Sequence, residues 1–349
     1  TNSSPSGSVK TNTGEVLVGA TVTATHEPTG TTYRVQSRAG GRFDISNMNP
    51  GGPYIVEVSF LNYANEKKTD LYLSLGDVLK VDFALASKVN NLGNVTVSSL
   101  RKTTETSGKG GAETTIGRDK MANLPTVGRN IYDYLRAVPQ AKLVNGSEGA
   151  VSIAGQNNRY NAFYVDGAIN NDVFGLSASG TNGGQAAIAP LSIDAIDQFQ
   201  VIIAPYDVRQ GMATGANINV VTKSGTNDWT GSGYYFGTNE GLVGNKIGDA
   251  TSQYGKFNRG QYGARVGGAI IKNKLFVFGS FEQEATTEPG SNFVATRTGT
   301  EPNKSIAKAE DLDRLKQFLL TKYNYDPGAY ENYNKEKYSQ KANLRIDWN

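Results

Sequence analysis

The stretch "GQYGARVGGAIIKNKLFVFGSFEQEA", residues 260–285, decides the fold of the C-terminal part of the chain. Side chains alternate between two faces on either side of the short sequence "KNK". One face holds Tyr262, Ala264, Val266, Gly268 and Ile270, followed after the turn by Leu275, Val277, Gly279 and Phe281. The other face holds Gly263, Arg265, Gly267 and Ala269, then Ser280, Glu282 and Glu284. Because one face suits lipid and the other tolerates charge, the alternation predicts two strands of a transmembrane antiparallel β-barrel.

Two further segments have the same character, "WTGSGYYFG" (229–237) and "YSQKANLRIDW" (338–348). The turn at 272–274 is tight, whereas the connections at 238–259 and 285–337 are long and polar. The second long connection carries an amphipathic helix, with Leu312, Leu315, Phe318 and Leu319 on one side. Short turns at one end and long loops at the other are typical of outer-membrane barrels. A soluble β-sandwich is the alternative for these segments.

The number of strands predicts that the chain is incomplete. Barrels that enclose a plug have about 22 strands, and these segments supply about four. Open sheet edges that face lipid do not occur in a bilayer. We therefore expect the chain to be the N-terminal part of a longer protein.

The composition excludes several classes of protein. With 41 Gly, 18 Tyr and 13 Phe in 349 residues, it favours many short strands with glycine turns. A net charge of +3 is too balanced to indicate a nucleic-acid partner. There is no cysteine and one histidine, which removes disulfides, thiolate zinc sites and most imidazole chemistry. No apolar run is long enough for a transmembrane helix, and "TNSSPSGSVK" at the start has neither Met nor the apolar stretch of a signal peptide.

Residues 1–87 predict a small β-sandwich. Strands alternate there with Gly, Asn and Pro turns at short, regular spacing. In "ATVTAT" (20–25), Val22 and Ala24 alternate with threonines, as on a strand with one buried face. His26, at the end of that strand, is interpreted as a surface or hydrogen-bonded histidine. The pattern of this region resembles the carboxypeptidase-regulatory-like, transthyretin-like domain, which does no chemistry of its own.

Residues 114–226 predict a domain of mixed α+β type. "GRNIYDYLRAVPQ" (128–140) reads as an amphipathic helix that has Asn130 as N-cap and ends at Pro139, with Ile131, Tyr134, Leu135 and Val138 on one face. "AVSIAGQNNRYNAFYVDGAINND" (150–172) predicts two short strands joined by a polar turn and followed by a polar loop. Beyond it we expect a short helix that runs into a buried strand at 200–204, and another strand at 217–223.

The middle region resembles the plug domain of TonB-dependent outer-membrane receptors. The resemblance rests on "SIAGQNNRYNAFYVDGAINND" (152–172) and on "DAIDQFQV" (194–201) followed by "KSG" (223–225). A regulatory-like domain ahead of a plug is the layout of the Oar-like and Sus-type branches. It implies a mainly β protein of the outer membrane, with the N-terminal domain and plug on the periplasmic side and the long loops extracellular. The expected domains are 1–87 (sandwich), 88–113 (TonB box and linker), 114–226 (plug) and 227–349 (first barrel strands).

"LGNVTVSS" (92–99) predicts a short strand beside a polar, flexible stretch, with no partner strand. Receptors of the family carry a short extended TonB box between the N-terminal extension and the plug. The resemblance assigns that box to Asn94, Val95, Thr96 and Val97. A free strand exposes N–H and C=O groups that can extend another protein's sheet, here that of TonB, which is energised with ExbB and ExbD. The alternatives are a last strand of the sandwich or an ordinary linker.

Two polar loops of the plug are the candidate ligand site. We expect Gln156, Asn157, Asn158 and Arg159, together with Asn170, Asn171 and Asp172, to face the ligand. Asn and Tyr side chains there would suit peptide or glycan, and a small chelate fits no less well. A calcium ion at "VDGAINND" (165–172) is an alternative to a solvated turn. The ligand itself is not indicated by the sequence.

The function that we predict is energised uptake of a ligand through a plugged barrel. No nucleophile elbow, P-loop, dinucleotide motif or metal cluster is present, so we expect neither an enzyme nor a cofactor. The resemblance implies TonB and outer-membrane lipid as partners, and a surface lipoprotein lid in the Sus-type branch. The alternative function is a surface adhesion or structural protein that uses the barrel as an anchor.

Overall fold

The computed structural model describes residues 3–76, 78–88, 96–99, 112–126, 128–144, 150–184, 188–203, 211, 214–244, 246–247, 250–251, 255–291, 293–301 and 303–349. The chain divides into two compact units. The first comprises Thr1–Gly231, Arg265–Ser280 and Asn343–Asn349, and the second comprises Ser232–Ala264 and Phe281–Ala342. The first unit therefore contains the N-terminal domain, the plug and one end of the barrel strands.

The N-terminal domain is a β-sandwich, as predicted. Its smaller sheet has the order β4 (Arg42–Asp44), β1 (Ser6–Thr11), β7 (Phe83–Leu85). Its larger sheet has the order β3 (Thr31–Gln36), β2 (Thr21–His26), β5 (Gly51–Ser59), β6 (Glu66–Leu73), β8 (Thr96–Ser99). Alternate residues of β2 and β5 enter the core, among them Val22, Ala24, Tyr54, Val56 and Val58.

His26 is a hydrogen-bonded residue of the sandwich core. Only 9% of it is exposed, and its Nδ1 lies 2.7 Å from the Thr29 hydroxyl. Its ring packs on that of Tyr54 with centroids 4.7 Å apart. Burial, and then the charge of Arg118, lowers the pKa of His26 to about 4. The interpretation of His26 as a hydrogen-bonded histidine is correct.

The strand at 96–99 has a partner, so the prediction of an unpaired strand is wrong for these residues. β8 pairs in parallel with β6, with Thr96 opposite Glu66 and Ser99 opposite Thr69. The physical reason is that β6 is otherwise the edge of the larger sheet, and its unpaired backbone groups accept a further strand. The structure thus agrees with the alternative in which this segment is the last strand of the sandwich.

The plug domain contains a five-stranded sheet with helices on one face. The strand order is β13 (Ala168–Ile169), β12 (Ala162–Val165), β15 (Ala216–Thr222), β14 (Ile196–Ile203), β9 (Glu113–Ile116). A two-stranded sheet adds β10 (Ala141–Leu143) and β11 (Val151–Ile153), and the helices are α1 (Arg118–Asn123) and α2 (Ile131–Leu135). Asn130 caps α2 as predicted, because its side chain accepts a hydrogen bond of 3.2 Å from the Asp133 N–H. The apolar face of α2 lies in one core with Phe163, Phe199 and Ile218.

Three local predictions in the plug need correction. α2 ends at Leu135, ahead of the predicted end at Pro139, because the chain continues from Arg136 in turns. β14 begins at Ile196, ahead of the predicted start at residue 200, because the preceding helix is only a 3₁₀ turn, Ile193–Ala195. β12 and β13 form a hairpin where we expected a polar loop. Asp166 (φ 49°) and Gly167 (φ 88°) are both left-handed, which is the backbone of a two-residue hairpin turn.

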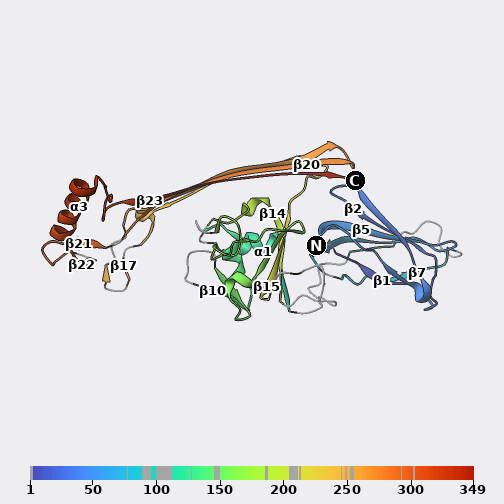
Figure 1. Cartoon of the computed structure of the whole chain (residues 1–349). Coiled ribbons are helices and arrows are strands. Elements are labelled where there is room, and N and C mark those ends of the chain that lie inside the picture. Colours follow the sequence, from blue (N-terminus) through green and yellow to red (C-terminus); the bar gives the residue numbers. More distant parts are fainter. Residues whose placement is uncertain are drawn as a thin grey trace. The chain divides into compact units, whose positions relative to one another are not determined.

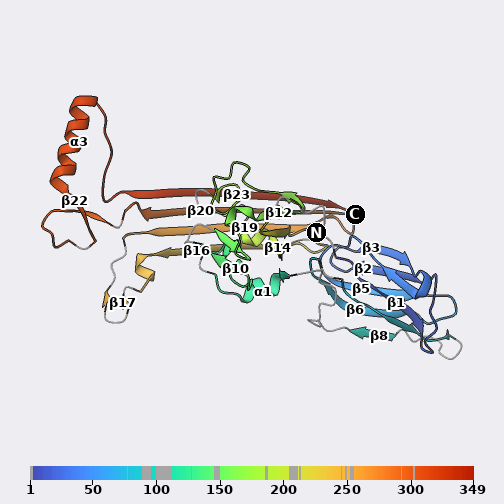
Figure 2. The same cartoon turned by 60° about the horizontal axis from the view of Figure 1, so that its bottom comes forward.

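Four long strands form the barrel sheet, in the order β16 (Thr230–Asn239), β19 (Asn258–Ile271), β20 (Leu275–Pro289), β23 (Asn334–Trp348). Figure 2 shows them side by side, and the predicted number of strands is confirmed. The predicted faces are also confirmed, since Val266, Ile270 and Phe281 are exposed whereas Glu282 is 1% exposed. The tight turn at 272–274 joins β19 to β20, and we call this end of the strands the turn end.

The long connections lie at the other end of the strands. The first contains β17 (Lys246–Ile247) and β18 (Ala250–Thr251), which pair with each other. The second contains β21 (Val294–Thr296), β22 (Lys304–Lys308) and α3 (Ala309–Tyr323), the predicted amphipathic helix. β17, β21, β22 and α3 are labelled in Figure 1. In the described part of the chain, no helix is long and apolar enough to span a membrane.

Candidate functional site: the plug, its loops and the barrel wall

Three loops meet at the end of the plug sheet where β12 and β15 begin, which we call the loop end. They are the loops at 154–161 and 170–184, and the described residues 211 and 214–215 of the third. Asn161, at the end of the first loop, bonds to two strands. Its Nδ2 donates to the Val151 carbonyl of β11 at 2.7 Å, and its Oδ1 accepts from the Ala216 N–H of β15 at 3.1 Å. The Thr181 hydroxyl lies 2.8 Å from the Tyr132 hydroxyl, which anchors the second loop to α2. The structure therefore brings both predicted ligand loops to one end of the plug.

In the first loop, some of the predicted ligand residues are exposed and others hydrogen-bond within the plug. Gln156, Asn157 and Arg159 are exposed. The Asn157 side chain also accepts from the Arg159 N–H at 3.0 Å, which caps a short 3₁₀ turn. Asn158 is only partly exposed, and its Nδ2 donates to the Ala178 carbonyl of the second loop. Gln156 and Arg159 are thus the most available side chains of this loop.

In the second loop, the predicted ligand residues mainly accept hydrogen bonds from backbone N–H groups of the plug. Asn171 accepts from the Phe163 N–H at 2.8 Å, and Asp172 accepts from the N–H groups of Phe174 at 3.0 Å and Ser177 at 2.6 Å. These backbone donors, with Ser177 first, keep the pKa of Asp172 below its usual value. Asn170 accepts from Asn182 Nδ2 at 3.1 Å. Asn171 and Asp172 therefore support the loop more than they present polar groups.

The second loop carries an apolar tip that we did not predict. The turn around Asp172 leaves Val173 and Phe174 more than 80% exposed, and Leu176 is 64% exposed. The sequence signal was the apolar "VF" and "L" inside an otherwise polar loop. At the loop end, the plug thus presents apolar as well as polar side chains.

At the opposite end of the plug, Asp166 of the "VDG" sequence fixes the end of β15. Both of its carboxylate oxygens accept from Thr222, from the N–H at 2.9 Å and from the hydroxyl at 2.6 Å. Arg345 of β23 donates to the Thr222 carbonyl at 2.8 Å and lies 3.5 Å from Asp166. Asp347 holds the Nε of Arg345 at 2.9 Å. Arg345 therefore bonds a barrel strand to the plug where β15 ends. We call this end of the plug the crossing end.

Lys223 follows β15 directly. Its Nζ donates to the Asp194 carbonyl at 2.8 Å. Burial, and then the nearby charge of Arg265, lowers the pKa of Lys223 to about 8.

The inward faces of the barrel strands form a charged network in the second unit. Tyr234 of β16 donates to Glu282 at 2.6 Å, and Lys341 of β23 donates to the other oxygen of Glu282 at 2.8 Å. Glu284 lies 3.6 Å from Lys341 and 2.7 Å from Arg259 of β19. All four strands contribute a side chain, so the network fixes their relative register. The sequence predicted Glu282 and Glu284 on this face but not their partners.

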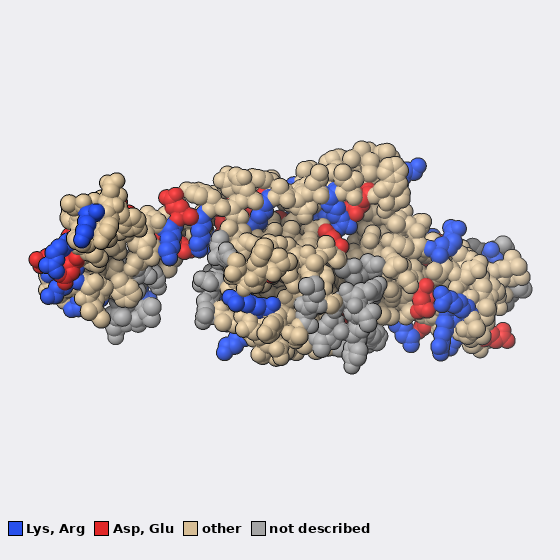
Figure 3. Space-filling model, viewed as in Figure 1, with Lys and Arg blue, Asp and Glu red and all other residues tan. Residues whose placement is uncertain are grey.

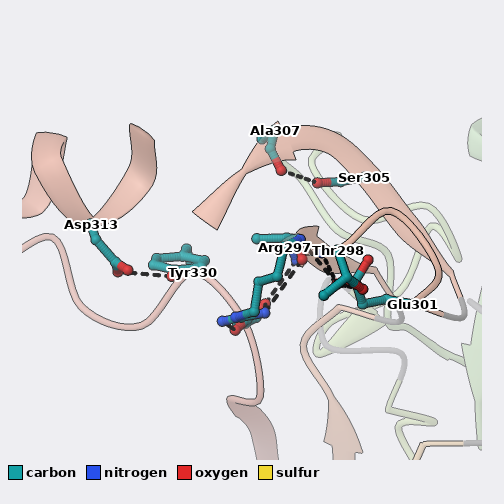
Figure 4. A network of polar contacts seen from close by, with 9 residues as sticks. Arg297, Thr298, Glu301, Ser305, Ala307, Asp313 and Tyr330 are labelled. Carbon is teal, nitrogen blue, oxygen red and sulfur yellow. Dashed lines mark hydrogen bonds and ion pairs between the residues drawn. The ribbon is translucent and has the colours of Figure 1, made fainter. Parts of the chain in front are cut away.

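The connection between β20 and β23 folds into a polar lobe, residues 290–333, shown in Figure 4. Arg297 pairs with Glu331, which also accepts from the Ala295 N–H at 2.8 Å. Tyr330 donates to Asp313 of α3 at 2.8 Å. Glu301 accepts from the backbone of a tight turn, mainly from the Thr298 N–H, which lowers the pKa of Glu301 to about 2. The lobe is therefore held by its own polar contacts.

The predicted TonB box lies partly outside the described residues. Thr96 and Val97 belong to β8, at the edge of the sandwich sheet. Asn94 and Val95 lie outside the described residues. Within the described part of the chain, no group of three or more His, Asp or Glu side chains is arranged to hold a metal ion. Figure 3 shows acidic and basic side chains interspersed on the visible face.

Family profiles match three successive parts of the chain. The "Carboxypeptidase regulatory-like domain" matches residues 6–86, the "TonB-dependent Receptor Plug Domain" matches 106–217, and the "Outer membrane beta barrel domain" matches 221–345. A plug whose last strand leads directly into a barrel sheet is the arrangement seen in the structure. The chain belongs to the TonB-dependent receptors and is a protein of the outer membrane.

Among curated proteins, the chain is similar to the TonB-dependent transporter Oar of Myxococcus xanthus. The two are 35% identical over 156 residues, which is 42% of this chain and 14% of that protein. Similar solved structures include the siderophore receptor PirA from Acinetobacter baumannii, with 20% identity and a TM-score of 0.37 over 50% of this chain and 24% of that one. The outer membrane transporter YddB from Escherichia coli has 16% identity and a TM-score of 0.41 over 52% and 27%. The chain thus spans a small part of the length of these relatives.

Proposed function

We propose that the protein containing this chain takes up a ligand across the outer membrane, driven by TonB. The observation that carries the proposal is the contact between the barrel sheet and the plug at the crossing end, where Arg345 bonds to Thr222 and Asp166. Residues 223–229 are all that link β15 of the plug to β16 of the barrel. We infer that a plug held in this way closes the pore of the complete barrel, so that opening the pore requires work on the plug.

The proposed orientation follows from the lengths of the connections. Outer-membrane barrels have short periplasmic turns and long extracellular loops. The turn end, with the turn at 272–274, would then face the periplasm, and the lobe at 290–333 would face the outside. β16 starts next to the crossing end of the plug, so the loop end would face incoming ligand. A surface lipoprotein lid is a further proposed partner on that side.

For ligand contact we propose Gln156, Asn157 and Arg159 of the first loop and Asn170 of the second. Their side chains are wholly or partly exposed at the loop end. Asn158, Asn171 and Asp172 act instead by holding the two loops in shape.

For energy coupling we propose that Asn94, Val95, Thr96 and Val97 are the TonB box. Among the described strands, β8 is the last in its sheet, so one of its edges is available there to an added strand. TonB, energised with ExbB and ExbD, would pair with this segment and pull.

The test is binding of the purified periplasmic domain of TonB to a peptide that spans residues 88–106. A matched peptide carries Val95→Pro and Val97→Pro, because proline removes the N–H donors that a paired strand needs. We expect binding to the first peptide and at least tenfold weaker binding to the second. Equal binding, or none to either, would favour the alternative of a passive surface anchor.

A further inference from the structure

The N-terminal sandwich contacts the plug through the loop that follows β6. Leu75 is fully buried, although it belongs to neither hydrophobic core. Its N–H donates to Gln198 Oε1 at 3.3 Å, and its carbonyl accepts from Gln200 Nε2 at 3.1 Å. Both glutamines lie on β14 and are at most 5% exposed. Two side-chain amides of the plug sheet thus take the place of a partner strand for this one residue.

A second contact joins the sandwich to the turn end of the barrel. The turn between β2 and β3 carries Pro28, whose carbonyl accepts from the Asn227 N–H at 2.7 Å. The Thr31 hydroxyl accepts from Asn349 Nδ2 at 2.6 Å. Asn227 in turn bonds to Asn273 of the tight turn, Nδ2 to Oδ1, at 2.8 Å. Asn227 precedes β16, Asn273 joins β19 to β20, and Asn349 follows β23.

Both contacts depend on a glycine that has no room for a side chain. Gly76 has φ 75°, and a Cβ there would collide with the Gln200 amide. Gly30 has φ 67°, and a Cβ there would collide with the Asn273 side chain. In the same sandwich, Gly14 (φ 93°) and Gly19 (φ 86°) have the same kind of backbone but no atom within 4 Å of a Cβ.

We propose that the N-terminal sandwich is a brace that ties the plug sheet to the barrel at the turn end and helps to keep the plug closed at rest. One rigid β-sandwich holds β14 through Leu75 and the barrel turns through the turn at 27–31. Movement of the plug against the barrel must therefore break one of these two contacts. The role as a brace rests on the proposed function, because it needs a plug that closes a pore.

The docking itself is tested by cross-linking in the full-length receptor in outer membranes. Thr31→Cys and Asn349→Cys are introduced together, and this chain contributes no other cysteine. We expect a short thiol-reactive cross-linker to join the two positions. The control replaces Thr31→Cys with Gln36→Cys, at the other end of β3 and five residues from Thr31, which is about 16 Å away at a rise of about 3.3 Å per residue. Absence of the cross-link, or equal cross-linking in the control, would overturn the docking without bearing on uptake.

The brace is tested by passive entry of an antibiotic that is too large for general porins, in cells that lack TonB. The receptor carries Gly30→Val and Gly76→Val, and the matched control carries Gly14→Val and Gly19→Val. We expect entry several-fold faster with the first pair than with the control, at equal amounts of receptor in the membrane. Equal entry would overturn the role as a brace. Because TonB is absent, this result does not depend on energised uptake.

Discussion

At the scale of single residues, Arg345 is the side chain that connects the barrel sheet to the plug. It belongs to the barrel but bonds to Thr222 of the plug, whose N–H and hydroxyl are held by Asp166. The "VDG" sequence was part of the family resemblance, yet its role is visible only in the structure: Asp166 closes a hairpin turn and fixes the end of β15. Arg345 lay in the predicted strand "YSQKANLRIDW" (338–348), but nothing in the sequence indicated its partner.

We predict that Arg345→Ala destabilises the contact at the crossing end by about 1.5–3 kcal/mol, the range for hydrogen bonds that involve a charged group. The amide of Thr222 should then exchange hydrogen for deuterium faster in the full-length receptor. The control is Arg314→Ala on α3, whose ion pair with Asp311 is largely exposed. An unchanged exchange rate at Thr222 would contradict the claim that Arg345 of the barrel stabilises this end of the plug.

We predict that His26 makes the sandwich less stable in acid. Its pKa is near 6.5 when unfolded and about 4 when folded, so the folded state binds its proton less tightly. Stability from this group is complete above pH 6.5 and decreases as the pH falls toward 4, by up to about 3 kcal/mol. Urea unfolding of the wild type and His26→Gln at pH 7 and pH 4.5 measures this loss. The variant should lose less stability between the two pH values, and an equal loss would refute the assignment.

At the scale of elements, the charged network on the inward face of the barrel strands determines how these strands register. Glu282 is 1% exposed, and the side chain of Lys341 beside it is 11% exposed, so the two charges are largely shielded from water and compensate each other. Removal of one partner from a buried pair costs about 3–5 kcal/mol, because the other charge is left uncompensated.

We therefore predict that Glu282→Ala and Lys341→Ala each lower the stability of the barrel, and that the double variant loses less than the sum of the two. Unfolding of the full-length receptor, followed by its heat-dependent mobility in gels, measures all three. The matched pair is Glu288 and Lys337, which are more exposed and 3.7 Å apart. Additive losses at Glu282 and Lys341 would contradict direct coupling.

The elements also show where prediction from the sequence ends. Period-two alternation predicted the barrel strands and their faces, because each side chain there meets either lipid or the lumen. The partner of β8 was missed, because a four-residue strand carries no signal for which edge it joins. The hairpin at Asp166 and Gly167 was missed because Asp-Gly was read as part of a polar loop, although it favours a two-residue turn.

At the scale of the whole molecule, the order of domains was predictable and the contacts between them were not. Each domain has its own core pattern, which is local in sequence. The two hydrogen bonds to the backbone of Leu75 join residues more than 120 positions apart. They come from glutamines of β14, a strand that the sequence predicts to be buried. The seven predicted ligand residues lie at one end of the plug, but three of them, Asn158, Asn171 and Asp172, support the loops. Composition alone cannot distinguish that role from ligand contact.

The central claim is that TonB drives this receptor through the segment at 94–97. The most direct measurement is the affinity of the TonB periplasmic domain for the purified full-length receptor, compared with Val95→Pro and Val97→Pro in the same protein. Thr103→Pro and Thr106→Pro in the following linker are the control. The account predicts that the first pair weakens binding at least tenfold and that the control does not. Equal affinity in all three proteins would contradict it.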